Sequence, residues 1–168
     1  MATILLIPHV HAGDRTVWVG DHDLRPLSEL GQRQAEALAE VLASRELRAL
    51  YASPALRARQ TLEPLARELG LEVEVKIGLA EKQLGEDRPA MAARGWTALQ
   101  GFAEEAGEWT VAAASHGDMI PALVQFLVDE CRLVPVPDLT RRGQWFEIEI
   151  EGKDVWVTLS EGPAGFPL

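Results

Sequence analysis

The sequence has one cysteine, Cys131, in 168 residues. A single cysteine excludes an internal disulfide and fits a reducing compartment. Because Cys131 lies in the apolar run 122–133, we interpret it as a small buried hydrophobe rather than a reactive thiol.

Long apolar runs are also missing. No stretch approaches the roughly 20 apolar residues that a membrane span needs. The opening segment, residues 1–8, has no basic region and too short an apolar run for a signal peptide. We therefore expect a cytoplasmic protein.

Positive charge is scarce, because 16 Lys and Arg face 26 Asp and Glu, for a net charge of −10. Nucleic acids and anionic membranes bind to basic surfaces, so neither is an expected partner. An anionic substrate would need a local positive pocket that works against the field of the whole chain.

Metal-ligand spacings are absent as well. None of the four histidines belongs to a His-x-x-x-His or Glu-x-x-His pattern. We expect no metal and no other cofactor.

The remaining composition is ordinary, with 47% apolar and 25% charged residues. The length suits one domain with a complete core, so we expect residues 1–168 to form a single domain.

Apolar patterning divides the chain into alternating strands and helices. Strands are expected at 3–7, 47–52, 71–77 and 109–114, and a terminal hairpin at 144–150 and 154–160. Helices are expected at 28–44, 53–69, 89–106 and 118–133, with a loop at 12–27. Ser28 and Ser53 are the expected N-caps of the first two helices, with Pro54 at the first position of the second.

This order of elements predicts an α/β fold. We expect a three-layer α/β/α sandwich with a mostly parallel sheet and a C-terminal antiparallel hairpin at its edge. The carboxyl ends of parallel strands meet at one edge, where ligands bind. His9, the segment 53–57, Glu81 and His116 follow such ends, so they should converge.

The converging residues suit a phosphate group. Arg57 lies in the first turn of a predicted helix, whose free N–H groups favour anions, and its guanidinium matches phosphate oxygens. The alternative is that Arg57 and Arg59 are both surface arginines. The two histidines favour the phosphate site, because imidazole can attack phosphorus or, when protonated, stabilise the transferring oxygens.

A general acid would protonate the leaving group, and Glu81 is the expected donor. Glu86 and Asp87 are close enough in sequence to fill the same role. His11 and His22 are interpreted as pocket or loop residues. The residues expected to contact the substrate are His11, Arg15, Ser53 and Gly117.

Five segments together resemble the histidine phosphatase superfamily, also called phosphoglycerate-mutase-like, and occur in its order over most of the chain. They are His9, the run 27–35, the run 53–61, Leu79-Ala80-Glu81 and Ser115-His116-Gly117-Asp118. Chain size and Gly13-Asp14-Arg15 resemble the small phosphohistidine phosphatase, SixA-like branch. Arg141-Arg142-Gly143 with the terminal hairpin is similar to the histidine phosphatase domains attached to Nudix hydrolases.

The resemblance implies a metal-free phosphatase that forms a covalent phosphohistidine. His9 would be the nucleophile, Arg57 and His116 would bind and polarise the phosphate oxygens, and Glu81 would donate the proton. The substrate would be a phosphorylated small molecule or a phosphohistidine protein. A mutase role is not expected, because no long insertion encloses a bisphosphate.

One departure from the family pattern concerns the nucleophile itself. The family reads Arg-His-Gly or Arg-His-Ala, whereas this chain reads Pro8-His9-Val10. Losing one preorganised donor costs on the order of 10²–10³ in rate. Three explanations stay open: an impaired phosphatase, a substitute arginine (Arg15 or Arg25), or a degenerate module that binds phosphorylated ligands without turnover.

Oligomeric state is left open between a monomer and a homodimer. The edge hairpin carries Trp145 and Trp156, which could support a dimer.

Overall fold

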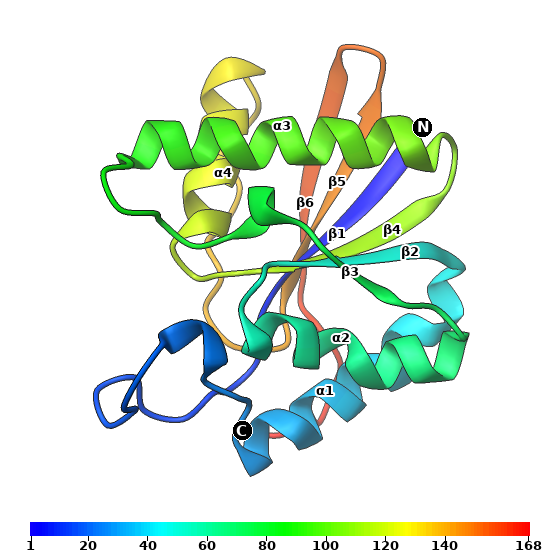
Figure 1. The fold of residues 1–168 in the computed structure, drawn as a ribbon. Helices are drawn as coiled ribbons and strands as arrows, with labels where there is room; N and C mark the ends of the chain where they lie inside the picture. Colours follow the sequence, from blue (N-terminus) through cyan, green and yellow to red (C-terminus); the bar gives the residue numbers. More distant parts are fainter.

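The computed structural model describes residues 1–168. Its six-stranded sheet has the order β3-β2-β4-β1-β5-β6 (Figure 1). The strands are β1 (Ala2–Pro8), β2 (Leu47–Ala52), β3 (Val73–Val75), β4 (Thr110–Ser115), β5 (Trp145–Glu151) and β6 (Asp154–Ser160). β1 to β4 are parallel, and the β5–β6 hairpin joins β1 in antiparallel pairing. The predicted sheet is confirmed.

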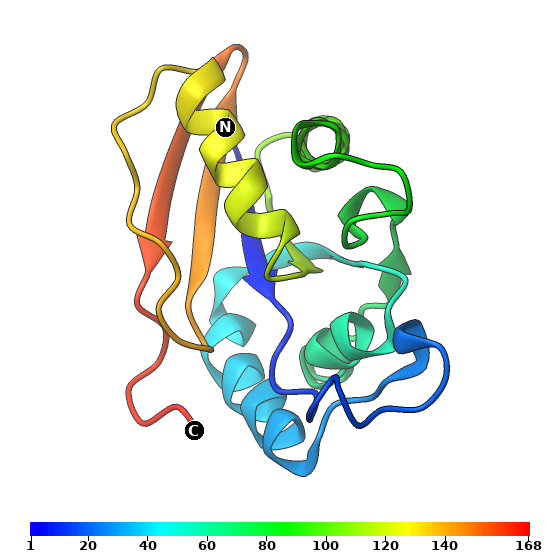
Figure 2. The same ribbon diagram turned by 90° about the vertical axis from the view of Figure 1, so that its left-hand side faces the viewer.

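Helices cover both faces of the sheet. α1 (Glu29–Leu42) and α2 (Leu56–Leu69) lie on one face, and α3 (Arg88–Ala106) and α4 (Met119–Glu130) on the other (Figures 1 and 2). Three short 3-10 helices complete the chain, η1 (His22–Leu24), η2 (Ala43–Arg45) and η3 (Ile77–Leu79). The three-layer α/β/α sandwich is therefore confirmed.

The apolar run of β1 joins the two halves of the core. Ile4 and Leu6 pack into the cluster with α3 and α4, and Leu5 and Ile7 into the cluster with α1 and α2. All four side chains are fully buried. Because successive strand residues face opposite sides, an unbroken apolar run is what a strand covered on both faces requires.

The start of α1 agrees with the prediction and the start of α2 does not. Ser28 caps α1, and its hydroxyl accepts a hydrogen bond from Gly31 N–H. α2 begins at Leu56 with Ala55 as N-cap, so Ser53 is not the cap and Pro54 is not the first helical residue. The Ser53 hydroxyl is instead 2.7 Å from His116 Nε2, a tertiary contact that local sequence does not reveal.

Two further boundaries differ from the prediction. The strand predicted at 71–77 covers only Val73–Val75, because the chain turns into η3, where Gly78 packs tightly on α3. A Cβ at Gly78 would lie 2.6 Å from that of Ala98. The last helix ends at Glu130 rather than 133.

The two hairpin tryptophans differ in exposure. Trp145 is buried in the cluster with α1 and α2, so it is not available to a dimer surface, whereas Trp156 is 47% exposed. Cys131 packs against the margin of the other cluster but is only half-buried, so the prediction of a buried residue is confirmed in part. None of the helices combines the length and apolar character that crossing a bilayer requires.

Candidate active site

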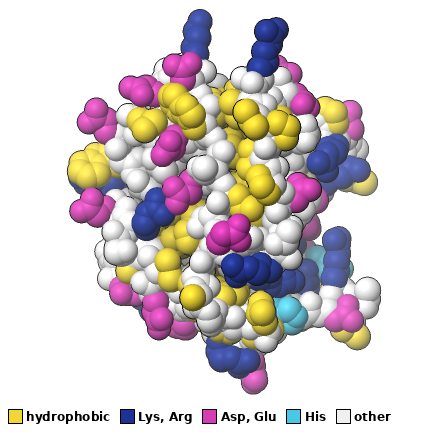
Figure 3. Space-filling model, turned by 180° about the vertical axis from the view of Figure 1, so that it is seen from behind, with side chains coloured by type: hydrophobic (Ala, Val, Ile, Leu, Met, Phe, Trp, Pro, Cys, Tyr) yellow, Lys and Arg dark blue, Asp and Glu magenta, His cyan; other side chains and the backbone are white.

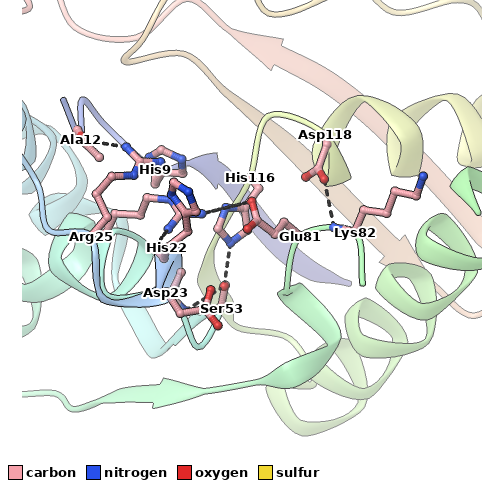
Figure 4. Close-up of polar contacts among 12 residues, drawn as sticks. His9, Ala12, His22, Asp23, Arg25, Ser53, Glu81, Lys82, His116 and Asp118 are labelled. Atoms are coloured by element: carbon pink, nitrogen blue, oxygen red, sulfur yellow. Dashed lines mark hydrogen bonds and ion pairs between the residues drawn. The ribbon is translucent and has the colours of Figure 1, made fainter. Parts of the chain in front are cut away.

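The candidate site forms where β1, β2 and β4 end. His9 follows β1, Ser53 follows β2 and His116 follows β4 (Figure 4). The sheet hydrogen bonding continues into the site, since His9 N–H donates to Ser115 O over 2.9 Å and Ser53 N–H to Ala114 O over 3.0 Å. The backbones that carry these side chains are thus held by the sheet.

His9 is oriented by its own loop. Its Nδ1 lies 2.8 Å from the carbonyl oxygen of Val10. Because a carbonyl only accepts, Nδ1 carries the proton and Nε2 keeps its lone pair. Burial lowers the pKa of His9 to about 3, and the positive charges of Arg57 and Arg142 add to this effect. At neutral pH His9 is therefore a neutral imidazole with a free nucleophilic nitrogen.

His116 packs edge-on against His9. The ring centroids lie 5.4 Å apart and the ring planes meet at 69°. His116 Nδ1 faces the Nη2 donor of Arg57 at 3.4 Å, so the proton lies on Nε2, which donates to Ser53 Oγ. Burial, followed by the charge of Arg57, lowers the pKa of His116 to about 4.

Arg57 connects the site from the first turn of α2. Its side chain is buried, which excludes the surface alternative. Nη1 donates to His22 O over 2.6 Å and Nη2 to Glu81 Oε2 over 3.1 Å, while the buried Nε has no partner. A buried cation with an unused donor is suited to an anionic ligand.

Glu81 is the carboxylate that reaches Arg57 and His116. Its Oε2 lies 3.1 Å from Arg57 and 3.7 Å from His116 Nδ1. The other two carboxylates considered have different partners. Glu86 forms an ion pair with Arg94 at 2.9 Å, and Asp87 caps α3 by accepting from Ala90 N–H.

Arg25 adds a second buried guanidinium. It is only 8% exposed, Nη1 donates to Ala12 O over 2.5 Å, and its buried Nε has no partner. Burial, then the charges of Arg57 and Arg15, lower the pKa of Arg25. Arg15 is exposed, and its charge also contributes to the lowered pKa of His116.

These arginines form a local positive region on a chain of negative net charge. Figure 3 shows Lys and Arg side chains beside histidine at the lower right, near the loop drawn blue in Figure 1. The site therefore has the local positive charge that an anionic substrate requires.

His11 and Gly117, also predicted to contact the substrate, have these surroundings in the structure. His11 Nδ1 lies 2.6 Å from Ser28 Oγ, and its N–H donates to Gln34 Oε1 over 2.9 Å, so its polar contacts run to α1. No hydrogen bond joins His11 to His9 or His116. Gly117 lies exposed at the turn into α4, with open space where a Cβ would point.

Sequence reasoning overlooked Thr61. Its hydroxyl accepts from Val10 N–H over 3.1 Å and donates to Arg57 O over 2.8 Å. It thus holds the loop that orients His9 against the helix that carries Arg57. The only sequence signal is its place in the run 53–61.

The arrangement combines a free imidazole nitrogen, a second imidazole, two buried guanidinium groups and a carboxylate. Such a set can attack, bind and protonate a phosphoryl ester. No three His, Cys, Asp or Glu side chains gather as ligands of a metal ion.

Comparisons with known proteins agree with this chemistry. Residues 10–88 match the family model of the histidine phosphatase superfamily, branch 1. Over 148 residues the chain is 30% identical to an 8-oxo-(d)GTP phosphatase of Mycolicibacterium smegmatis. That match covers 88% of this chain and 44% of the relative, so the chain spans less than half the relative's length.

Solved structures share the fold. Bacillus stearothermophilus YhfR has a TM-score of 0.78 at 20% identity, over 94% of this chain and 95% of that one. A mycobacterial glucosyl-3-phosphoglycerate phosphatase with VO3 has a TM-score of 0.76 at 22% identity, over 94% and 96%. The protein histidine phosphatase SixA with tungstate has a TM-score of 0.67 at 20% identity, over 92% and 93%.

Proposed function

We propose that the chain belongs to the histidine phosphatase superfamily, whose model matches residues 10–88, and that it hydrolyses a phosphomonoester or a protein phosphohistidine through a covalent phosphohistidine on His9. The observation that carries this proposal is the state of His9. Its Nδ1 is bonded to Val10 O, and its Nε2 is unprotonated beside buried guanidinium groups.

In the first step His9 Nε2 attacks phosphorus and forms an N–P bond while the bond to the leaving oxygen breaks. Arg57, Arg25 and His116 bind the non-bridging oxygens, whose charge must be stabilised through the transfer. Glu81, in its protonated form, gives its proton to the leaving oxygen. General acid catalysis of this kind contributes about 10²–10⁴ in rate.

In the second step water attacks the phosphohistidine. Glu81, now a carboxylate, accepts a proton from that water, and the N–P bond breaks with its electron pair returning to Nε2. Inorganic phosphate leaves, and His9 is again neutral. No step uses a metal, so we expect turnover of p-nitrophenyl phosphate to stay within two-fold after EDTA treatment.

The second candidate is a degenerate module that binds phosphorylated ligands without turnover, and Pro8 favours it. Pro8 ends β1 opposite Ser115 and offers neither a guanidinium nor a backbone N–H. We propose weak catalysis instead, because Arg25 and Arg57 each keep a buried, unpartnered Nε at the site.

Turnover of p-nitrophenyl phosphate by wild type and His9→Ala distinguishes the two candidates. The phosphatase proposal expects slow wild-type turnover that His9→Ala abolishes. Orthovanadate binding with no turnover in the wild type would favour the binding module. Turnover that survives His9→Ala would contradict the covalent mechanism.

The substrate class follows from the same site. We propose a phosphorylated small molecule or a phosphohistidine protein, bound by residues 1–168 acting as one domain. Two relatives are named as phosphatases of 8-oxo-(d)GTP and of glucosyl-3-phosphoglycerate, which supports small phosphorylated molecules as the first to assay.

A further inference from the structure

β5, the neighbour of β1, begins just after a pair of arginines. Across the antiparallel pair, Phe146 lies opposite Leu6. Continuing that register brings Gln144 opposite Pro8 and sets the turn with Arg141 and Arg142 beyond the end of β1. Figures 1 and 2 both show the chain entering β5 beside that end. Pro8, which stands where the family pattern has an arginine, therefore lies next to a turn that carries two arginines.

This turn is fixed in place by a buried side chain. Gln144 is 2% exposed, and its Oε1 accepts from Thr140 N–H over 2.8 Å and from Arg141 N–H over 3.1 Å. Its Nε2 donates to Glu161 over 3.1 Å. Gly143, with φ of +90°, packs so closely on Phe166 that a Cβ would lie 2.8 Å from the ring.

The two arginines of the turn differ in what they contact. Arg141 donates to the backbone oxygen of Glu161 and lies 3.9 Å from its carboxylate. Arg142 is exposed and makes no hydrogen bond or ion pair within the chain. Its charge is the smallest of the causes that act on the lowered pKa values of His9 and Arg25. The Arg142 guanidinium thus has no partner within the chain, and the turn that carries it lies beyond the end of β1 that leads to His9.

We propose that Arg142 binds a non-bridging oxygen of the phosphoryl group, in the role that an arginine at position 8 would otherwise fill. This inference rests on the proposed phosphatase function. An exposed side chain must give up rotamer freedom when it closes on the ligand. Arg142 therefore replaces a preorganised donor only in part, and catalysis stays slower than an arginine on β1 would allow.

The first test compares Arg142→Gln with Arg141→Gln, which removes the same charge from the same turn. Orthovanadate binding measured by calorimetry, and kcat/KM for p-nitrophenyl phosphate, are the readouts. We expect Arg142→Gln to weaken vanadate binding about ten-fold and lower kcat/KM by about 10². Arg141→Gln should stay within about three-fold of wild type in both. Equal effects of the two substitutions would overturn the inference.

The second test introduces Pro8→Arg into the wild type and into Arg142→Gln. If Arg142 occupies the role of the missing arginine, Pro8→Arg should raise kcat/KM at least ten-fold more in Arg142→Gln than in wild type, because coupled residues are not additive. Equal gains in the two backgrounds would overturn the inference. The melting temperature of each variant checks that it is folded.

His9→Ala distinguishes a failure of the Arg142 assignment from a failure of the proposed phosphatase function. If His9→Ala abolishes turnover while Arg142→Gln behaves as Arg141→Gln, the assignment of Arg142 fails and the phosphatase proposal stands. If the wild type neither binds vanadate nor turns over p-nitrophenyl phosphate, both fail together.

Discussion

The imidazole rings of His9 and His116 meet edge to face, with centroids 5.4 Å apart, although they follow different strands. His116 is buried and His9 partly buried, and both are neutral at pH 7, because burial and nearby arginines lower their pKa values to about 4 and about 3. An arriving phosphate dianion reverses the local electrostatics and favours the charged imidazole. His116 should therefore gain a proton as substrate binds, while the N–P bond forms at His9.

The lowered pKa of His116 predicts a pH-dependent stability. Unfolded histidine titrates near its ordinary pKa of 6.5, whereas folded His116 stays neutral down to about 4. As the pH falls from 7 to 5, the unfolded chain binds more protons and the free energy of unfolding decreases. The contribution of His116 to this decrease is about 2 kcal/mol.

His116→Gln removes this titration, so the free energy of unfolding should decrease less in the variant than in wild type. Urea unfolding at pH 5, 6 and 7, in acetate and MES buffers without phosphate, measures both. Parallel pH profiles for the two proteins would contradict a buried neutral His116.

Glu81 is predicted to matter most for poor leaving groups. Glu81→Gln cannot donate a proton, so kcat/KM for phenyl phosphate, which reports the transfer to His9 and not the later hydrolysis, should fall by about 10²–10³. For p-nitrophenyl phosphate, whose phenolate leaves without help, the loss should be at least ten-fold smaller. Glu86→Gln is the matched control, because Glu86 is bonded to Arg94 rather than Arg57. Equal losses on both substrates would contradict the role of general acid.

Gly31 allows α1 to approach the loop after the nucleophile. A Cβ on Gly31 would lie 1.9 Å from the carbonyl oxygen of His11. Gly31→Ala should destabilise the protein by about 1–3 kcal/mol, the usual range for an overpacked site. Gly101→Ala, on α3 with nothing within 4 Å of its Cβ, should be neutral or stabilising by up to about 1 kcal/mol. Thermal unfolding of the two variants tests this prediction. Equal melting temperatures for Gly31→Ala and Gly101→Ala would contradict the close approach of α1 to His11.

Sequence patterning predicted the parts of the fold that depend on periodic apolar residues. The buried run of β1 and the alternating hairpin gave the sheet and its antiparallel edge, and parallel strand ends predicted that His9 and His116 would meet. Ser53 was misinterpreted because a Ser-Pro pair resembles a helix start, whereas its hydroxyl bonds to His116 across the sheet edge.

Other features depend on tertiary contacts that no local pattern encodes. Glu81 follows η3 and forms its ion pair with Arg57. Glu86 is instead paired with Arg94, and Asp87 caps the start of α3. The turn with Arg142 lies beyond the end of β1 because β5 pairs with β1 in one particular register. That register is set by side-chain burial on both strands, so the position of the two arginines in the sequence does not predict it.

The most direct test of the account is to trap the phosphoryl group on the enzyme. We predict that rapid quenching with ³²P-labelled phenyl phosphate gives an acid-labile, base-stable adduct that peptide mapping assigns to His9. The adduct should be absent from His9→Ala. Turnover by the wild type without such an adduct, or an adduct that persists in His9→Ala, would contradict nucleophilic attack by His9.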